Sequence, residues 1–272
     1  MTWIGYPNTT GLDCIHYRVT DPVTDPVNTN QPFAEKLIRL PDCFLCFTPD
    51  CSSPDVKPPP FEDNGWVTFG SFNSLGKVQR ECFDLWIRVL RAVPNSRIAL
   101  KSNRAFSMPF IREYWHKKFE DQGITRDRVI LIGFMPSQAE HLSAYHQVDI
   151  ALDAFPYGGT TTISEAMYMG VPVVTLRAPI DRPLHSWNVG LGMNTTIGLT
   201  DLIAETKEEY VQIAQELAAS KDRLRDLRAT LREKLISSPL GDGPRFQRNV
   251  EAMYRSMWSE FCNGDWPPNR FG

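Results

Sequence analysis

The amino-acid sequence predicts an α/β protein built on a Rossmann-like, doubly wound parallel sheet, with further helices at its C-terminal end and an irregular N-terminal segment. Two observations predict the sheet. From about residue 61, short apolar runs alternate with longer amphipathic segments, which is the pattern of strands followed by crossover helices. Five such units follow one another, and strands joined in this way pair in parallel.

Prolines predict the irregular start, because they recur too often before residue 61 for long helices to form. Three consecutive prolines at 58–60 make a stiff, extended join. We therefore expect a domain boundary near residue 60. The sequence is divided accordingly into an N-terminal segment over residues 1–60, a sheet with C-terminal helices over 61–262, and a tail over 263–272.

Each element after the join has its own signal. The first strand is expected at 66–72, and the helix after it carries apolar residues at i, i+3, i+4, i+7 and i+8 until Pro94 ends it. These residues are Cys82, Leu85, Trp86, Val89 and Leu90. Further strands are expected at 97–101, 129–134, 148–153 and 171–176, with helices at 108–122, at 137–147 and up to residue 169. From about residue 207 the chain is predicted to be helical, packing on the sheet and across to another domain.

Composition excludes several classes of function. The net charge of -3 gives no long-range reason to expect nucleic acid as a partner, and no apolar stretch is long enough to span a membrane. The N-terminus lacks the pattern of a signal peptide, so a cytoplasmic or nuclear protein is expected. Cys43, Cys46 and Cys51 lack a fourth neighbouring ligand, which favours reduced thiols over a metal site.

The strongest local signal is the turn after the strand at 148–153. Gly158 and Gly159 let the backbone approach a ligand closely, and Thr160, Thr161 and Thr162 offer hydroxyls beside the free N–H groups of a helix start. Such a turn suits a diphosphate, and Glu165, about one helical turn on, can accept bonds from ribose hydroxyls. A lone Gly-Gly-Thr is more often a tight turn with a threonine N-cap, but three threonines followed by an acid favour ligand binding.

A second polar turn follows the strand at 66–72 and runs from Asn73 to Lys77. In a parallel sheet it faces the same edge as the threonine turn, so Lys77 can bind the β-phosphate and offset charge on a departing diphosphate. The alternative is a solvated surface lysine, which is the common fate of lysines. His141 precedes the threonine turn and can contact a nucleobase, although a lone histidine on a helix is usually structural; His185 could reach the pocket mouth.

These residues resemble those of a known family. The segments WIGYPNTTG (3–11), RLPDCFLC (39–46), FGSFN (69–73), FPYGGTTT (155–162) and SSP (237–239) look like the C-terminal catalytic region of the protein O-GlcNAc transferases, most closely the SPINDLY branch. The resemblance implies the C-terminal lobe of a two-lobed GT-B fold and inverting, metal-independent transfer of a sugar from a nucleotide to protein Ser or Thr.

The same resemblance implies roles for single residues. Lys77 matches the lysine on the donor diphosphate, Thr161 and Thr162 match the paired threonines of the phosphate-binding helix, and Glu165 matches the ribose-binding acid. His141 is similar to the base-contacting histidine after a one-residue shift. Asn73 and Thr160 complete the expected donor-binding set, in which Lys77 is the catalytic residue; no metal or other cofactor is expected.

Two departures leave the donor open. Thr160 stands where the animal enzymes have histidine, and Ser137 lies near the position of a donor-contacting lysine. Transfer of GlcNAc from UDP-GlcNAc is the expected reaction, and GDP-fucose-dependent O-fucosylation is the alternative. The chain shows no repeat of 20 to 50 residues, so the tetratricopeptide repeats and most of the N-terminal lobe, which would bind the acceptor, are expected to be missing. A scaffold that keeps the fold without catalysis is therefore a third possibility. A dinucleotide-dependent oxidoreductase is not favoured, because no G-x-G-x-x-G follows the first strand.

Overall fold

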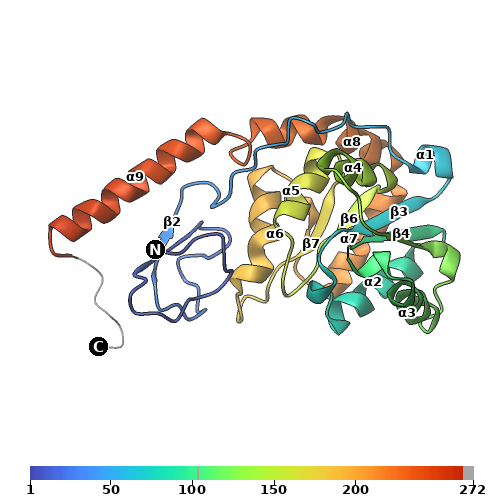
Figure 1. Ribbon diagram of the computed structural model, residues 1–272, viewed down its shortest axis with the longest axis horizontal. Helices are drawn as coiled ribbons and strands as arrows, with labels where there is room; N and C mark the ends of the chain where they lie inside the picture. Colours follow the sequence, from blue (N-terminus) through green and yellow to red (C-terminus); the bar gives the residue numbers. More distant parts are fainter. Residues whose placement is uncertain (103, 266–272) are drawn as a thin grey trace.

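The computed structural model describes residues 1–102 and 104–265, and within them a six-stranded parallel sheet forms the centre of the molecule (Figure 1). The strand order is β5-β4-β3-β6-β7-β8. Within this sheet the path of the chain begins at β3, moves outward to β5, returns to β6 beside β3, and then moves outward in the other direction. The strands are β3 Val67–Ser71, β4 Ser96–Lys101, β5 Val129–Ile132, β6 Ile150–Leu152, β7 Val173–Leu176 and β8 Ile203–Ala204.

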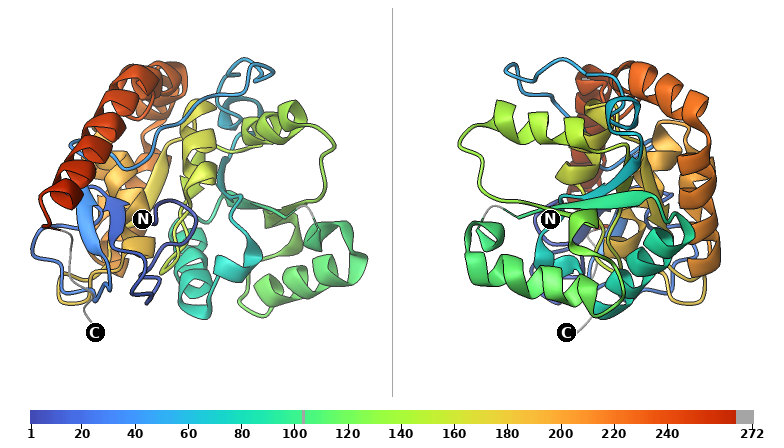
Figure 2. Two further views of the ribbon diagram at one scale, coloured as in Figure 1. Left: turned by 60° about the vertical axis from the view of Figure 1, so that its left-hand side comes forward. Right: turned by 90° about the vertical axis from the view of Figure 1, so that its right-hand side faces the viewer.

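The predicted fold class is confirmed. Central strands are buried on both faces, as the unbroken burial of β3 and β7 shows, because helices lie on both sides of the sheet (Figure 2). Phe69 pairs in register with Ile98 on one side and Ile150 on the other, which fixes β3 at the middle. All five predicted strands form. The sixth, β8, has two residues, which is too short to give a pattern in the sequence.

The helices largely follow the expected positions. On α2, which spans Arg80–Ala92, the five residues that were predicted to share a face are all buried. The helix expected at 137–147 is divided into α4 and the 3₁₀ turn η4, Ala144–Gln147, and a short 3₁₀ turn η1, Leu75–Lys77, follows β3. The α-helices are α1 Phe61–Asn64, α2 Arg80–Ala92, α3 Pro109–Glu120, α4 Gln138–Ser143, α5 Thr161–Tyr168, α6 His185–Thr196, α7 Lys207–Ala219, α8 Lys221–Ser237 and α9 Gly243–Cys262.

Helix α6 was not predicted from the sequence. Its buried residues include Trp187, Val189, Gly190, Gly192 and Asn194, which point to different sides of the helix. A helix that is buried nearly all round has no amphipathic period for a sequence pattern to reveal.

The N-terminal segment is less irregular than expected. It contains two short parallel strands, β1 Tyr17–Thr20 and β2 Lys36–Arg39. Tyr17 and Val19 form a small second core with Met253 and Met257 of α9, which extends from the sheet to lie over this segment (Figure 1). The C-terminal helices therefore contact the sheet through α7 and the N-terminal segment through α9. The domain boundary near residue 60 stays a prediction, and residues 266–272 of the predicted tail lie outside the described residues.

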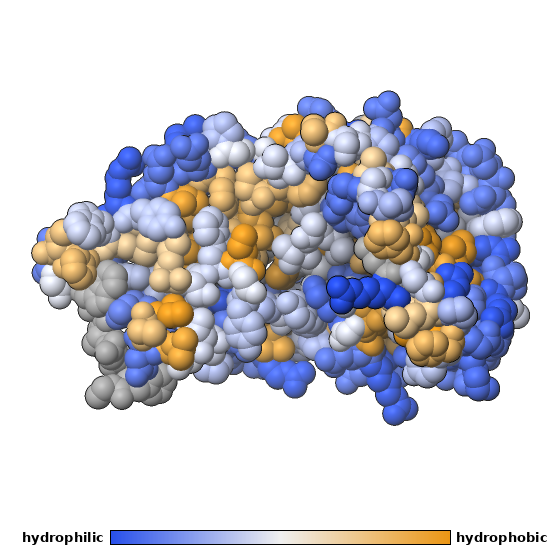
Figure 3. All heavy atoms as spheres, in the orientation of Figure 1, coloured by the Kyte–Doolittle hydropathy of each residue, from blue (hydrophilic) through white to orange (hydrophobic). Residues whose placement is uncertain are grey.

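The surface is mixed in character. Apolar residues are exposed at the end of the molecule to which α9 extends (Figure 3). The exposed rings of Trp258 and Phe261, both on α9, stack on each other. Over residues 1–102 and 104–265, none of the helices combines the length and the apolar character that crossing a lipid bilayer requires.

Candidate functional site

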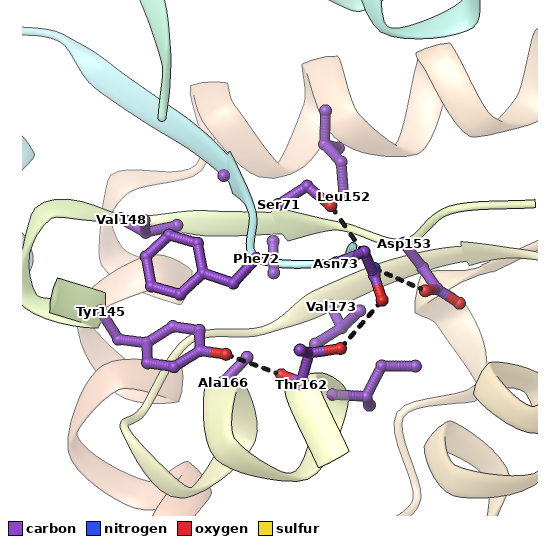
Figure 4. Close-up of a pocket in the computed structure, with 13 residues that line it drawn as sticks. Ser71, Phe72, Asn73, Tyr145, Val148, Leu152, Asp153, Thr162, Ala166 and Val173 are labelled. Atoms are coloured by element: carbon purple, nitrogen blue, oxygen red, sulfur yellow. Dashed lines mark hydrogen bonds between the residues drawn. The ribbon is translucent and has the colours of Figure 1, made fainter. Parts of the chain in front are cut away.

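The two predicted turns lie at one edge of the sheet, where the order of the strands reverses. Asn73 follows β3, Asp153 follows β6, and these two strands are direct neighbours. In open parallel sheets this reversal opens a crevice at the carboxyl ends of the strands, and ligands bind there. Figure 4 shows Asn73, Asp153 and Thr162 joined by hydrogen bonds at this point.

Direct contacts join the lysine turn to the threonine turn. Lys77 Nζ donates a hydrogen bond to the Gly158 carbonyl oxygen at 2.8 Å, and the same ammonium lies 4.1 Å from the centre of the Tyr157 ring. Thr162 Oγ1 donates to Asn73 Oδ1 at 3.0 Å. The predicted convergence of the two turns is therefore present in the structure.

The Lys77 side chain is partly buried. Partial burial lowers the pKa of this lysine, and the nearby Asp153 carboxylate opposes that effect. An ammonium has three N–H groups, of which one is used on Gly158. Counting the hydrogen bonds among residues 1–102 and 104–265, two donors therefore remain for an anionic ligand.

Asp153 organises the turn and was not among the predicted site residues. Its side chain is 1% exposed and accepts hydrogen bonds from the backbone of Ala154 (2.9 Å) and Gly159 (2.8 Å) and from the Thr175 hydroxyl (3.1 Å). Burial raises the pKa of Asp153 to about 6, while the hydrogen bond from Gly159 is the largest opposing effect. A single aspartate at the end of a strand has no distinctive sequence signal, so only the fold identifies this role.

Close packing explains the glycine at position 159. A Cβ atom there would come within 2.5 Å of Thr162 Oγ1 and 3.0 Å of Asn73 Oδ1. A larger residue would displace the Thr162 hydroxyl or the Asn73 amide oxygen, which are hydrogen-bonded to each other. Glycine therefore leaves room for the hydrogen bond that joins the two turns.

The three threonines have different surroundings. Thr160 stands at the N-cap position of α5, but its hydroxyl makes no capping bond within the described chain, so the simple N-cap interpretation is not what the structure shows. Thr161 is exposed. Thr162 already donates its hydroxyl proton to Asn73. The N–H groups of the first helical turn have no partner inside the helix and are available to an anion.

Glu165 and His141, which were given separate tasks, lie in contact with each other. His141 Nε2 is 2.9 Å from Glu165 Oε2, and Gln138 Nε2 donates to Glu165 Oε1 at 3.0 Å. The Tyr145 hydroxyl donates to the Thr162 carbonyl oxygen at 3.1 Å, and the Phe72 ring lies 4.3 Å from the Tyr145 ring. The sequence did not indicate Gln138, Tyr145 or Phe72 as parts of this group.

A small cavity lies between the two turns, lined by Phe72, Asn73, Tyr145, Asp153 and Thr162 (Figure 4). Its volume of about 20 Å³ has room for about one water molecule. A nucleotide would therefore have to lie on the outer side of this cavity, over Lys77 and the start of α5.

Other candidates from the sequence lie elsewhere. His185 does not line this cavity; its Nδ1 is 2.6 Å from Asp25 Oδ2 in the N-terminal segment. Ser137 accepts the N–H of Glu140 at 3.2 Å and so caps α4. In the described residues the cysteines are free thiols, and no three His, Cys, Asp or Glu side chains gather as metal ligands would.

Comparisons with known proteins agree with this geometry. The model of glycosyl transferase family 41 matches residues 1–50 and 62–250. The chain is 46% identical over 270 residues to a probable UDP-N-acetylglucosamine–peptide N-acetylglucosaminyltransferase SPINDLY of Hordeum vulgare, covering 99% of this chain and 28% of that protein. A SPINDLY protein of Arabidopsis thaliana is 44% identical, with 99% and 29% covered.

Among solved structures, a mutant of the Thermobaculum terrenum O-GlcNAc transferase superposes with a TM-score of 0.87 at 32% identity, covering 97% of this chain and 49% of that one. The chain spans less than a third of the length of the two SPINDLY relatives. The match over most of its residues shows that the chain belongs to glycosyl transferase family 41.

Proposed function

We propose that this chain is the donor-binding region of a protein O-glycosyltransferase, which transfers GlcNAc from UDP-GlcNAc to Ser or Thr hydroxyls with inversion and without a metal ion. The observation that carries the proposal is the contact of Lys77 with the Gly158 turn at the strand reversal between β3 and β6. Two elements suited to a diphosphate meet there, in a chain of family 41.

In this proposal the diphosphate lies between Lys77 and the first turn of α5. The bond from the sugar C1 to the phosphate oxygen breaks while the acceptor hydroxyl attacks from the opposite face and loses its proton to solvent water. The departing diphosphate gains negative charge, and the Lys77 ammonium and the free N–H groups at Thr161 and Thr162 stabilise it. These donors are already positioned, so little reorganisation is needed at the moment of reaction.

The nucleoside is proposed to lie along α4 and α5. Glu165 would accept the ribose hydroxyls and His141 would contact the base, with Gln138 holding the Glu165 carboxylate from the other side. Positioning of the acceptor is proposed to come from parts of a longer protein, namely the rest of the N-terminal lobe and tetratricopeptide repeats. A cytoplasmic or nuclear location is also a proposal.

One observation favours GDP-fucose as the second candidate donor. Ser137 lies near the position at which the O-GlcNAc enzymes are expected to have a donor-contacting lysine. Its side chain is a neutral hydroxyl that caps α4, so it offers no positive charge to the donor. Thr160 likewise offers a hydroxyl instead of an imidazole. The names of the relatives support UDP-GlcNAc, because they describe N-acetylglucosaminyltransferases.

Calorimetry tests nucleotide binding directly. The chain should bind UDP or GDP, and Lys77→Ala should weaken binding by at least tenfold, since a charge-assisted bond to phosphate is worth about 1.5–3 kcal/mol. Lys117→Ala is the matched control, because Lys117 is an exposed lysine on α3 whose ion pair with Asp121 is on the surface. Absence of binding to either nucleotide would support the scaffold alternative.

The donor can be identified with the longest available form of the protein. It is incubated separately with UDP-GlcNAc and GDP-fucose, and the release of free nucleoside diphosphate and the labelling of protein Ser or Thr are measured. Release from UDP-GlcNAc alone supports the first candidate. Release from GDP-fucose alone refutes it in favour of the second.

A further inference from the structure

Helix α6 lies between the N-terminal segment and the donor turn, which is defined as residues 154–159. On one side, its Gly192 faces the N-terminal segment so closely that a Cβ there would meet Thr24 Oγ1 at 2.5 Å. Its Gly190 faces the site instead, where a Cβ would meet Thr175 Oγ1 at 2.4 Å and Asp153 Oδ2 at 2.7 Å. Residues two apart on a helix point in nearly opposite directions, so α6 touches both regions at once.

The first turn of α6 is attached to the N-terminal segment by several buried bonds. His185 Nδ1 lies 2.6 Å from Asp25 Oδ2, and the His185 backbone N–H donates to Gln31 Oε1 at 2.7 Å. Asn188 Nδ2 donates to the Thr24 carbonyl oxygen at 3.2 Å. His185 is 3% exposed and Asp25 1%, so both are shielded from water. Bonds between buried polar groups are costly to break, because each group is left without a partner.

The same turn of α6 holds the donor turn. Gly158 N–H donates to the Ser186 carbonyl oxygen at 2.8 Å, and Ser186 Oγ donates to the Pro156 carbonyl oxygen at 3.0 Å. The Phe155 ring stacks on Trp187 with 5.4 Å between centroids. Gly158 is the residue whose carbonyl receives Lys77. One helical turn therefore connects Asp25 in the N-terminal segment to the contact between the lysine and threonine turns.

We propose that α6 couples the N-terminal segment to the donor turn, and that His185, through its bond to Asp25, is the positioning residue of this coupling. The N-terminal segment then does more than cover the sheet: it fixes where Gly158 and Lys77 lie. By reciprocity, a nucleotide that tightens the donor turn also tightens the segment around Asp25. The nucleotide part of this inference rests on the proposed function, whereas the mechanical link does not.

Amide hydrogen exchange of the nucleotide-free protein tests the link. His185→Ala should speed exchange in peptides covering the donor turn, where the Gly158 and Gly159 amides are hydrogen-bonded, by about tenfold. His185→Asn keeps an N–H near the position of Nδ1 and should restore most of the protection. Lys36→Ala is the control, because it removes an ion pair between the N-terminal segment and Glu260 of α9 without touching α6. Unchanged exchange at the donor turn in folded His185→Ala protein would overturn the proposal.

Nucleotide binding gives a second readout. UDP or GDP, whichever binds, should bind His185→Ala about tenfold more weakly and Lys36→Ala as tightly as the unaltered chain. A merely structural role of His185 lowers the melting temperature but leaves the affinity of the folded protein unchanged, and this result contradicts the coupling. If His185→Ala does not fold, the unaltered chain decides: bound nucleotide should slow exchange at residues 20–31 as well as at the donor turn. Protection confined to the donor turn refutes the proposal. Failure of the unaltered chain to bind either nucleotide refutes the proposed function alone.

Discussion

Replacing Asp153 with alanine would leave three close hydrogen-bond donors without their acceptor, and it would also remove the longer bond, of 3.5 Å, from Asn73 Nδ2 to Oδ1. The backbone N–H groups of Ala154 and Gly159 both donate to Oδ1, and the Thr175 hydroxyl donates to Oδ2. Asparagine keeps one oxygen for the two backbone donors, and the Thr175 hydroxyl can rotate to accept from its amide. Both variants are neutral, so the cost of a buried charge cancels between them.

The difference between the two variants therefore reports the hydrogen bonds of the donor turn. At about 1 kcal/mol or more for each unsatisfied buried donor, Asp153→Ala should be less stable than Asp153→Asn by about 3 kcal/mol. Urea unfolding followed by circular dichroism measures this difference. Nucleotide binding should follow the same order, because the amides that lose their acceptor shape the turn at Gly158. Equal stabilities of the two variants would show that Asp153 does not hold the turn.

Three further outcomes are expected. Gly159→Ala should abolish detectable nucleotide binding, because its Cβ would meet Thr162 Oγ1 at 2.5 Å, while Gly243→Ala, which meets no described atom within 4 Å, should bind normally in calorimetry. Between pH 4 and pH 7 the free energy of unfolding of the unaltered chain should fall with rising pH relative to that of Asp153→Asn. The pKa of Asp153 is about 6 in the folded state and 3.8 in the unfolded state, so between these values the folded state binds the proton more tightly. The stability that this proton gives is lost as the pH rises through 6. Urea-unfolding profiles of the two proteins that run parallel across this pH range would contradict the prediction. Glu165→Gln should weaken nucleotide binding by about tenfold without lowering the melting temperature by more than a few degrees; equal affinity in calorimetry would remove Glu165 from the site.

The two turns could be predicted because each follows a strand with a clear apolar run. Once Lys77 and Thr162 were placed after parallel strands, the geometry of such sheets required them to lie at one edge. The direct bond from Lys77 to the Gly158 carbonyl oxygen could not be predicted in the same way. It depends on the adjacency of β3 and β6, which is a property of strand order and not of either segment alone.

What the sequence did not reveal has physical causes. Helix α6 is buried on several sides, so its residues show no period, and the pairing of His185 with Asp25 joins positions 160 apart. Strand β8 is held in the sheet by β7, since two residues have too little pattern to indicate a strand. Asp153 reads as an ordinary polar residue at a strand end. In each case the missing information is a contact made by residues distant in the chain.

The contact between His141 and Glu165 changes how a nucleoside could be bound. A carboxylate has about four lone-pair sites, of which Gln138 uses one on Oε1, while His141 and, at 3.5 Å, the Tyr145 hydroxyl bond to Oε2. The Glu165 side chain is 8% exposed and the His141 side chain 19%, so the acid is the more deeply buried member of the pair. In the proposed function, ribose and base would contact one hydrogen-bonded group, because any movement of His141 away from Glu165 changes a hydrogen-bond partner of the acid that is proposed to bind the ribose.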